Sequence, residues 1–77
     1  MTDENKQGAI AFVRSEIAIL SEQTDDDERR AYHHRANAAL FAIRAGGLIT
    51  IDELHALSDE IGAANEKASQ QVIAAQR

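Results

Sequence analysis

The chain has 77 residues, no cysteine, no proline and a formal net charge of −5. This length predicts a single domain over residues 1–77, and the lack of cysteine excludes a disulfide scaffold and a cysteine nucleophile. No stretch approaches the roughly 18 apolar residues of a membrane span. The acidic start of the chain is unlike a secretory signal, so we expect a cytoplasmic protein.

The hydrophobic content consists largely of alanine. Hydrophobic residues make up 44% of the chain, and 15 of these 34 residues are alanine. A core of fewer than about twenty large side chains is marginal for an isolated small domain. We therefore expect self-association, most simply as a symmetric homodimer.

The first predicted helix covers residues 4–22. Its large apolar residues recur at spacings of 3, 4 and 3, which places them on one helical stripe: Ile10, Val13, Ile17 and Leu20. Phe12 and Ile19 lie beside this stripe and widen the apolar surface. We assign Phe12 and Ile19 to the expected dimer interface.

The second predicted helix covers residues 25–45. Thr24 is the expected N-cap, and the acidic run 25–28 occupies the first turn, where carboxylates favour the helix dipole. The core-facing stripe consists of Tyr32, Ala36, Ala39, Leu40 and Ile43. Its alanines are expected to let a neighbouring helix approach closely.

The third predicted helix covers residues 51–75. A glycine of the pair Gly46-Gly47 can end the preceding helix in a left-handed conformation, and Thr50 with Glu53 forms a T-x-x-E capping box. The stripe of this helix runs through Leu54, Leu57, Ile61, Ala64, Ala68, Val72 and Ala75. Because this helix is the longest, we expect Val72 and Ile73 to overhang the bundle and join the dimer interface. The predicted fold is an all-α bundle of three antiparallel helices.

Catalytic and metal-binding motifs are lacking in the sequence. No nucleophilic triad or phosphate-binding loop is present. Adjacent His33 and His34 point about 100° apart on a helix, and His55 with Asp59 has no third ligand specified. Residues 47–54 resemble the second half of a calcium-binding EF-hand loop, but Ala42, Arg44 and Gly46 occupy the positions of its acidic ligands. We predict no catalytic residues, no metal and no cofactor.

Charge is segregated along the chain. Residues 1–28 carry a net charge of −6, residues 29–51 of +4, and residues 52–77 of −3. In the basic segment, Phe41 lies about 180° from Tyr32 on the helical wheel, so it is not explained by the core. A broad sector around Phe41 contains Arg29, Arg30, His33, His34, Asn37 and Arg44.

Three interpretations of this sector remain open. The arginines can pair with acids of the other two helices while Phe41 packs in a dimer. Alternatively, the sector binds another protein, since aromatic residues and arginine are enriched in interface hot spots. It can also bind nucleic acid through phosphate contacts, although the rest of the chain is acidic. The partner-binding residues that we predict are Arg29, Arg30, His33, Asn37, Phe41 and Arg44. The acidic run 25–28 also raises the minor alternative of a DNA mimic.

The stretch Phe12-Val13-Arg14-Ser15 resembles the start of the plasmid copy-number protein family Rop. That resemblance implies an RNA-binding helical-hairpin dimer with RNA contacts near Phe12 and Arg14. The acidic turn comes about three residues earlier here, and the third helix has no counterpart. In its general texture the chain is similar to small helical accessory proteins of phages and mobile elements, including anti-CRISPR inhibitors. This second resemblance implies a non-catalytic protein that binds and inhibits a host protein.

Overall fold

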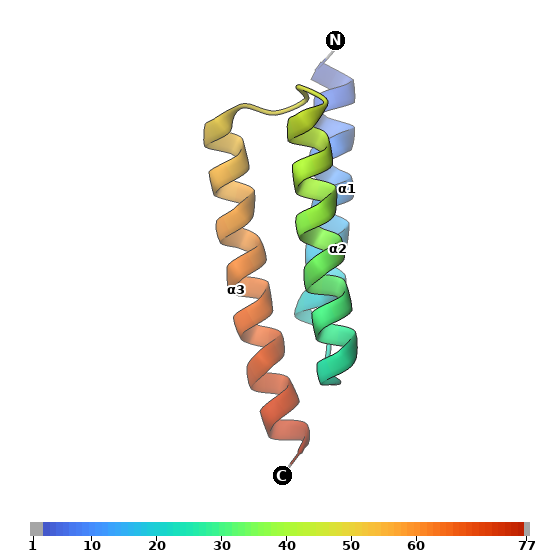
Figure 1. Ribbon diagram of the computed structural model, residues 1–77, viewed down its shortest axis with the longest axis vertical. Helices are drawn as coiled ribbons and strands as arrows, with labels where there is room; N and C mark the ends of the chain where they lie inside the picture. Colours follow the sequence, from blue (N-terminus) through green and yellow to red (C-terminus); the bar gives the residue numbers. More distant parts are fainter. Residues whose placement is uncertain (1–2, 77) are drawn as a thin grey trace.

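The computed structural model describes residues 3–76, which form three helices: α1 (Asp3–Ser21), α2 (Asp26–Ala45) and α3 (Ile51–Ala75). Successive helices run in opposite directions, and each packs against the other two (Figure 1). The result is a rod measuring 49 × 17 × 16 Å. The prediction of an all-α, antiparallel three-helix bundle is confirmed. Within residues 3–76, no helix is both long and apolar enough to cross a membrane.

The start of α2 differs from the prediction by one residue. The N-cap is Asp25, whose carboxylate accepts a hydrogen bond from the backbone N–H of Glu28 at 3.1 Å. The predicted cap, Thr24, lies one residue before it. Both residue types are good N-caps, and the residue whose side chain accepts from the third helical N–H is Asp25.

The connection between α2 and α3 confirms the predicted turn and cap. Gly47 has a φ of 74°, and the N–H of Leu48 donates to the carbonyl of Ile43 at 2.9 Å, which together form a Schellman motif. Thr50 and Glu53 make both bonds of the capping box. Because each bond spans only a few residues, the start of α3 is fixed locally.

The core lies along the predicted stripes. The buried apolar residues of the three helices are Val13, Ile17, Leu20, Ala36, Leu40, Ile43, Leu57, Ile61, Ala64, Ala68 and Val72. Ile10, Tyr32, Ala39 and Leu54 are half-buried at the edges of this core. Ala75, the expected end of the α3 stripe, is exposed instead.

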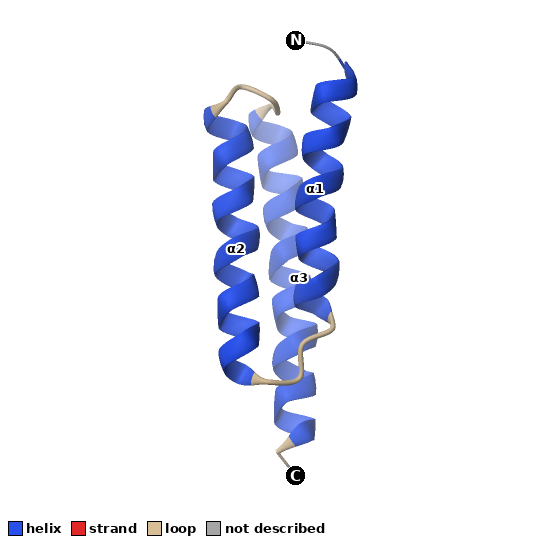
Figure 2. Cartoon of the chain, turned by 90° about the vertical axis from the view of Figure 1, so that its right-hand side faces the viewer, coloured by secondary structure: helices blue, strands red, loops and turns tan. Residues whose placement is uncertain are grey.

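The lower end of α3 extends past the other two helices (Figure 2). Gln71 holds this end in place, because its side-chain amide donates to the backbone carbonyls of Ser21 and Gln23 at 2.9 Å each. Val72 is buried, with only 6% of its surface exposed. The overhang therefore begins later than expected, and Val72 belongs to the interior of the single chain.

Candidate functional site

Arg29 is part of the fold and not of an exposed sector. Its side chain is only 16% exposed, and its guanidinium donates to Asp26 and, at 2.8 Å, to the side-chain oxygen of Asn65 on α3. Arg29 stands seven residues before the buried Ala36, which is two helical turns, so the two share a face. Arg29 is therefore bonded within the chain, and its role in partner binding stays a prediction.

The remaining polar residues of the predicted sector make local contacts. Arg30 is exposed and forms an ion pair with Asp26 at 2.8 Å. Arg44 donates to the backbone carbonyl of Ile49 at 2.7 Å and so braces the turn before α3. His33 and Asn37 are half-buried, and the Asn37 amide donates to the His33 carbonyl at 3.1 Å. Each of these residues therefore already makes a polar contact within the chain, which for His33 is made by its backbone carbonyl.

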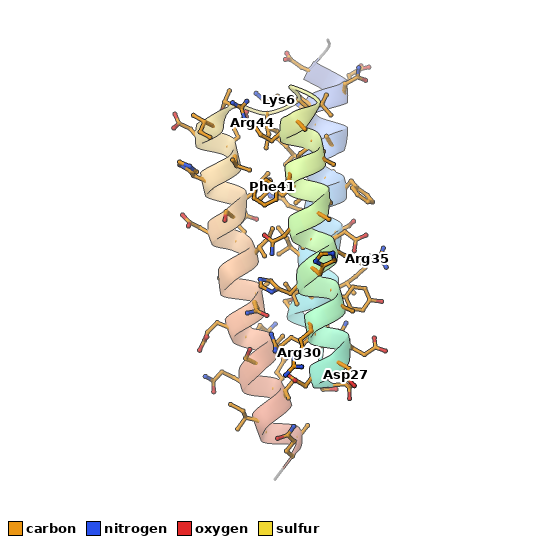
Figure 3. All side chains as sticks on the ribbon, viewed as in Figure 1. Lys6, Asp27, Arg30, Arg35, Phe41 and Arg44 are labelled. Atoms are coloured by element: carbon orange, nitrogen blue, oxygen red, sulfur yellow. The ribbon has the colours of Figure 1, made fainter. Side chains whose placement is uncertain are left out.

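Phe41 is the most exposed of the large apolar side chains that the structure describes, at 61%. Figure 3 shows it between α2 and α3, with Arg44 above it and Arg30 toward the lower end. Ile51, the first residue of α3, is also exposed, and it lies at the end of the bundle where Arg44 is found. We call the surface formed by Arg30, Phe41, Arg44 and Ile51 the Phe41 face.

An ion pair between a buried glutamate and an exposed arginine on the α1–α2 side was not predicted. Glu16 is 4% exposed, and its Oε1 accepts a hydrogen bond from Nη2 of Arg35 at 2.9 Å. Its Oε2 is buried without a hydrogen-bond partner. The Arg35 guanidinium lies 5.4 Å from the centre of the Tyr32 ring, on the side of α2 turned away from α3 (Figure 3). The sequence signal was an acid placed between two apolar residues of one helical side, Phe12 and Ile19.

The α1–α3 side is closed by charged contacts. Arg14 makes a two-pronged contact with Glu60, at 3.2 Å and 2.9 Å, and the hydrogen bond to that carboxylate raises the pKa of Arg14. Phe12 stands two residues earlier, about 200° around the helix, and so faces a different direction. RNA contact near Phe12 and Arg14 stays a prediction.

A second ion pair stands near the start of α3. Lys6 contacts Glu53 at 2.8 Å, and this contact, followed by the backbone hydrogen bond at Thr50, lowers the pKa of Glu53. Lys6 and Arg44 line a shallow, open hollow of about 430 Å³. Both cations already have partners within the chain, because Arg44 bonds to the Ile49 carbonyl.

The four residues assigned to a dimer interface do not form one surface. Phe12, Ile19 and Ile73 are exposed, whereas Val72 is buried. Ile73 lies beyond the end of α1, since Gln71 is already level with Ser21 and Gln23. Only Phe12 and Ile19 share an exposed side of one helix.

The acidic run before and within α2 is used for helix capping and pairing. Asp25 caps the helix, and Asp26 binds both Arg29 and Arg30.

Within residues 3–76, no three acidic or histidine side chains gather in the way that metal ligands do. No protein-family model, curated protein or solved structure matches this chain. Function is therefore inferred from the surface itself.

Proposed function

We propose that this chain is a non-catalytic binding module that engages another protein through the Phe41 face and thereby modulates or inhibits it. The observation that carries the proposal is the 61% exposure of Phe41. Burying an aromatic side chain of this kind gives a binding partner a large apolar contact. Among residues 3–76, Phe41 is not part of the hydrophobic core, so core packing does not account for a phenylalanine at this position.

The surroundings of Phe41 indicate the chemistry of the partner. Arg30 is exposed at 70% of its side chain, and Arg44 borders Phe41 one turn further along α2. Arg30 lies on the same side of α2 about three helical turns from Phe41. Aromatic residues and arginine are both enriched in interface hot spots. The complementary surface is an apolar pocket with an acidic rim, as a host-protein target of a small helical inhibitor would present.

The test is capture of the partner from the source cell, followed by titration of the protein identified. Phe41→Ala is expected to weaken binding by about 30-fold or more, which is the size of a hot-spot effect. The charged rim is tested with Arg30→Ala. A change at Arg44 is less suitable, because Arg44 also braces the α2–α3 turn. The matched control is Ile73→Ala, which removes an exposed apolar side chain at the far end of α3. Equal binding by Phe41→Ala and Ile73→Ala would refute the proposal.

Nucleic-acid binding through α2 is the competing function. The ion pairs of Arg29 and Arg30 with Asp26 leave less free positive charge on α2 than its sequence indicates. Phosphate binding weakens steeply with added salt because counterions are released. A salt-dependent titration with RNA or DNA at low ionic strength would favour this function over the protein-binding one, whereas a flat titration would remove it.

A further inference from the structure

The surface along which α2 meets α3 is the side of the bundle that carries Phe41 (Figure 3). Its α2 residues recur at alternating spacings of four and three, which places them on one helical stripe: Arg30, His34, Asn37, Phe41 and Arg44. The α3 residues with the same spacings are Ile51, His55, Ser58, Gly62 and Asn65. Because Asn65 accepts a hydrogen bond from Arg29 at 2.8 Å, this second stripe borders α2. We call the two stripes together the α2–α3 face.

An acidic row borders the α2–α3 face on its outer α3 edge. Asp52, Asp59 and Glu66 are spaced by seven residues, so they stand above one another on the helix, and all three are exposed. Each directly follows a residue of the α3 stripe, about 100° further around the helix. The opposite edge of the face is basic, because its α2 stripe contains Arg30 and Arg44.

The charges on the two edges of this face do not neutralise each other. Within residues 3–76, ion pairs join α1 to α2 and α1 to α3, but none joins α2 to α3. Arg30 pairs with Asp26 of its own helix, and Arg44 bonds to the backbone carbonyl of Ile49. A third element laid along this face therefore meets cationic side chains from α2 and carboxylates from α3.

We propose that the α2–α3 face holds an amphipathic helix of the partner protein, with carboxylates along the edge toward α2 and lysines or arginines along the edge toward α3. The proposal rests on the proposed function, because it takes Phe41 as the anchor for a partner protein. Phe41 then inserts as a knob into the hole between four side chains of the facing helix. Carboxylates beside that hole meet the exposed guanidinium groups of α2.

The fold favours a helix over other docking segments. Addition of a β-strand needs an exposed sheet edge, and residues 3–76 contain no strand. A polyproline segment needs a groove lined by aromatic residues, whereas Phe41 is the single phenylalanine, tyrosine or tryptophan of the α2–α3 face. An amphipathic helix needs an apolar anchor and room for close approach. An added Cβ at the exposed Gly62 meets nothing within 4 Å, so that part of the face is open.

The lengths of the two charged edges agree with a single docked helix. Arg30 and Arg44 are fourteen residues apart on α2, which is about 21 Å along the helix axis. Asp52 and Glu66 are also fourteen residues apart on α3. Because the two helices are antiparallel and joined by a short turn, these edges run side by side (Figure 1). A partner helix of about four turns therefore covers both edges.

The acidic edge also separates a protein partner from a nucleic acid. A phosphate backbone carries one sign of charge along its whole length. Laid on the α2–α3 face, it would meet the arginines of α2 but also the acidic row of α3. A helix can place opposite charges on its two sides, so electrostatic complementarity favours the helix.

Selection from a displayed library of helical peptides tests the charge pattern. Each peptide spans about five turns and has a fixed apolar stripe, while the positions on both sides of the stripe vary among glutamate, lysine and serine. On the wild-type chain, peptides with glutamate on one side and lysine on the other are expected to be enriched at least about tenfold over peptides with one sign on both sides. Phe41→Asp is expected to abolish this enrichment. Enrichment of like-charged sides, or of no charge pattern, would overturn the proposal.

Charge reversal at Asp59 locates the contact. The selected peptide is compared with a derivative in which glutamate replaces each lysine, and the wild type is expected to prefer the selected peptide. Asp59→Lys is expected to narrow the ratio of the two dissociation constants at least about fivefold, because the derivative no longer meets a like charge there. Glu4→Lys is the matched control, since it makes the same change of net charge at an exposed position of α1. Circular dichroism verifies that both variants fold. An equal ratio for Asp59→Lys and Glu4→Lys would overturn the proposal.

Two further outcomes would assign the face to another occupant and overturn the proposal. Displacement of the selected peptide by RNA at physiological ionic strength would indicate a nucleic-acid site. Dimers of the free chain that the selected peptide dissociates would indicate a second copy. The proposed function fails separately, when the captured partner binds Phe41→Ala as well as the wild type. A partner that is lost with Phe41→Ala but binds Asp59→Lys and Glu4→Lys equally would refute only the docked helix.

Discussion

At the scale of single residues, the Glu16–Arg35 pair is asymmetric. Glu16 is buried and Arg35 is mostly exposed. Removing Arg35 leaves a buried carboxylate without a counter-charge, and that desolvated charge is costly. Removing Glu16 leaves an exposed guanidinium that water can hydrate, and its contact with the Tyr32 ring at 5.4 Å remains.

This asymmetry predicts unequal effects of substituting the two partners. Arg35→Ala is expected to lower the free energy of unfolding by about 1–3 kcal/mol, because the buried carboxylate loses its donor. Glu16→Leu is expected to stay within about 1 kcal/mol of the wild type, since an apolar side chain replaces a partly satisfied charge. Urea unfolding at neutral pH, followed by circular dichroism at low micromolar concentration, measures both. A greater loss in Glu16→Leu than in Arg35→Ala would contradict this account.

At the scale of helices, the sequence predicted the helix ends and the core-facing stripes, but it did not predict the polar contacts between helices. The capping box at Thr50 and the left-handed Gly47 depend on bonds between residues a few positions apart, so their spacing in the sequence was sufficient. The apolar stripes predicted the core in the same way. The contacts Glu16–Arg35 and Arg29–Asn65 join residues 19 and 36 positions apart. Such contacts depend on how the helices align, which periodicity does not determine.

The turn between α2 and α3 gives a test at this scale. Gly47→Ala is expected to destabilise the protein by about 1–2 kcal/mol, because an L-residue is strained at a φ of 74°. The control is Gly62→Ala in the middle of α3, where an added Cβ meets nothing within 4 Å. Alanine is expected to stabilise that helix by up to about 1 kcal/mol.

Thermal unfolding is sensitive enough to separate the two glycine variants. A change of 1 kcal/mol shifts the melting temperature by about 4–8 °C in a domain of this size. Gly47→Ala should therefore melt below the wild type and Gly62→Ala at or above it. If the melting temperatures of both variants fall by similar amounts, the left-handed conformation of Gly47 is not what fixes the turn.

At the scale of the whole molecule, charge segregation along the sequence did not predict where charges meet. Within residues 3–76, the two ion pairs between α1 and α3 use Lys6 and Arg14 from the strongly acidic first segment. Arg29 and Arg30 of the basic segment pair with Asp26 of their own helix. After this pairing, Phe41 remains exposed on α2, and Phe12 and Ile19 remain exposed on α1. The proposed binding of a partner protein uses the first of these surfaces.

Because the core is small, we expect self-association to add measurably to the stability of the folded chain. Three of the twelve buried apolar residues in the described part of the chain are alanines, and a domain of this size buries only about 60% of its unfolded surface. Because dimer formation stabilises the folded state by mass action, the melting temperature of the wild type is expected to rise with protein concentration. Phe12→Asp is expected to abolish that dependence, while Phe41→Asp retains it. A wild-type melting temperature that is constant from low to high micromolar concentration would mean that the single chain is stable without a second copy, and that the exposed Phe12 and Ile19 need another explanation.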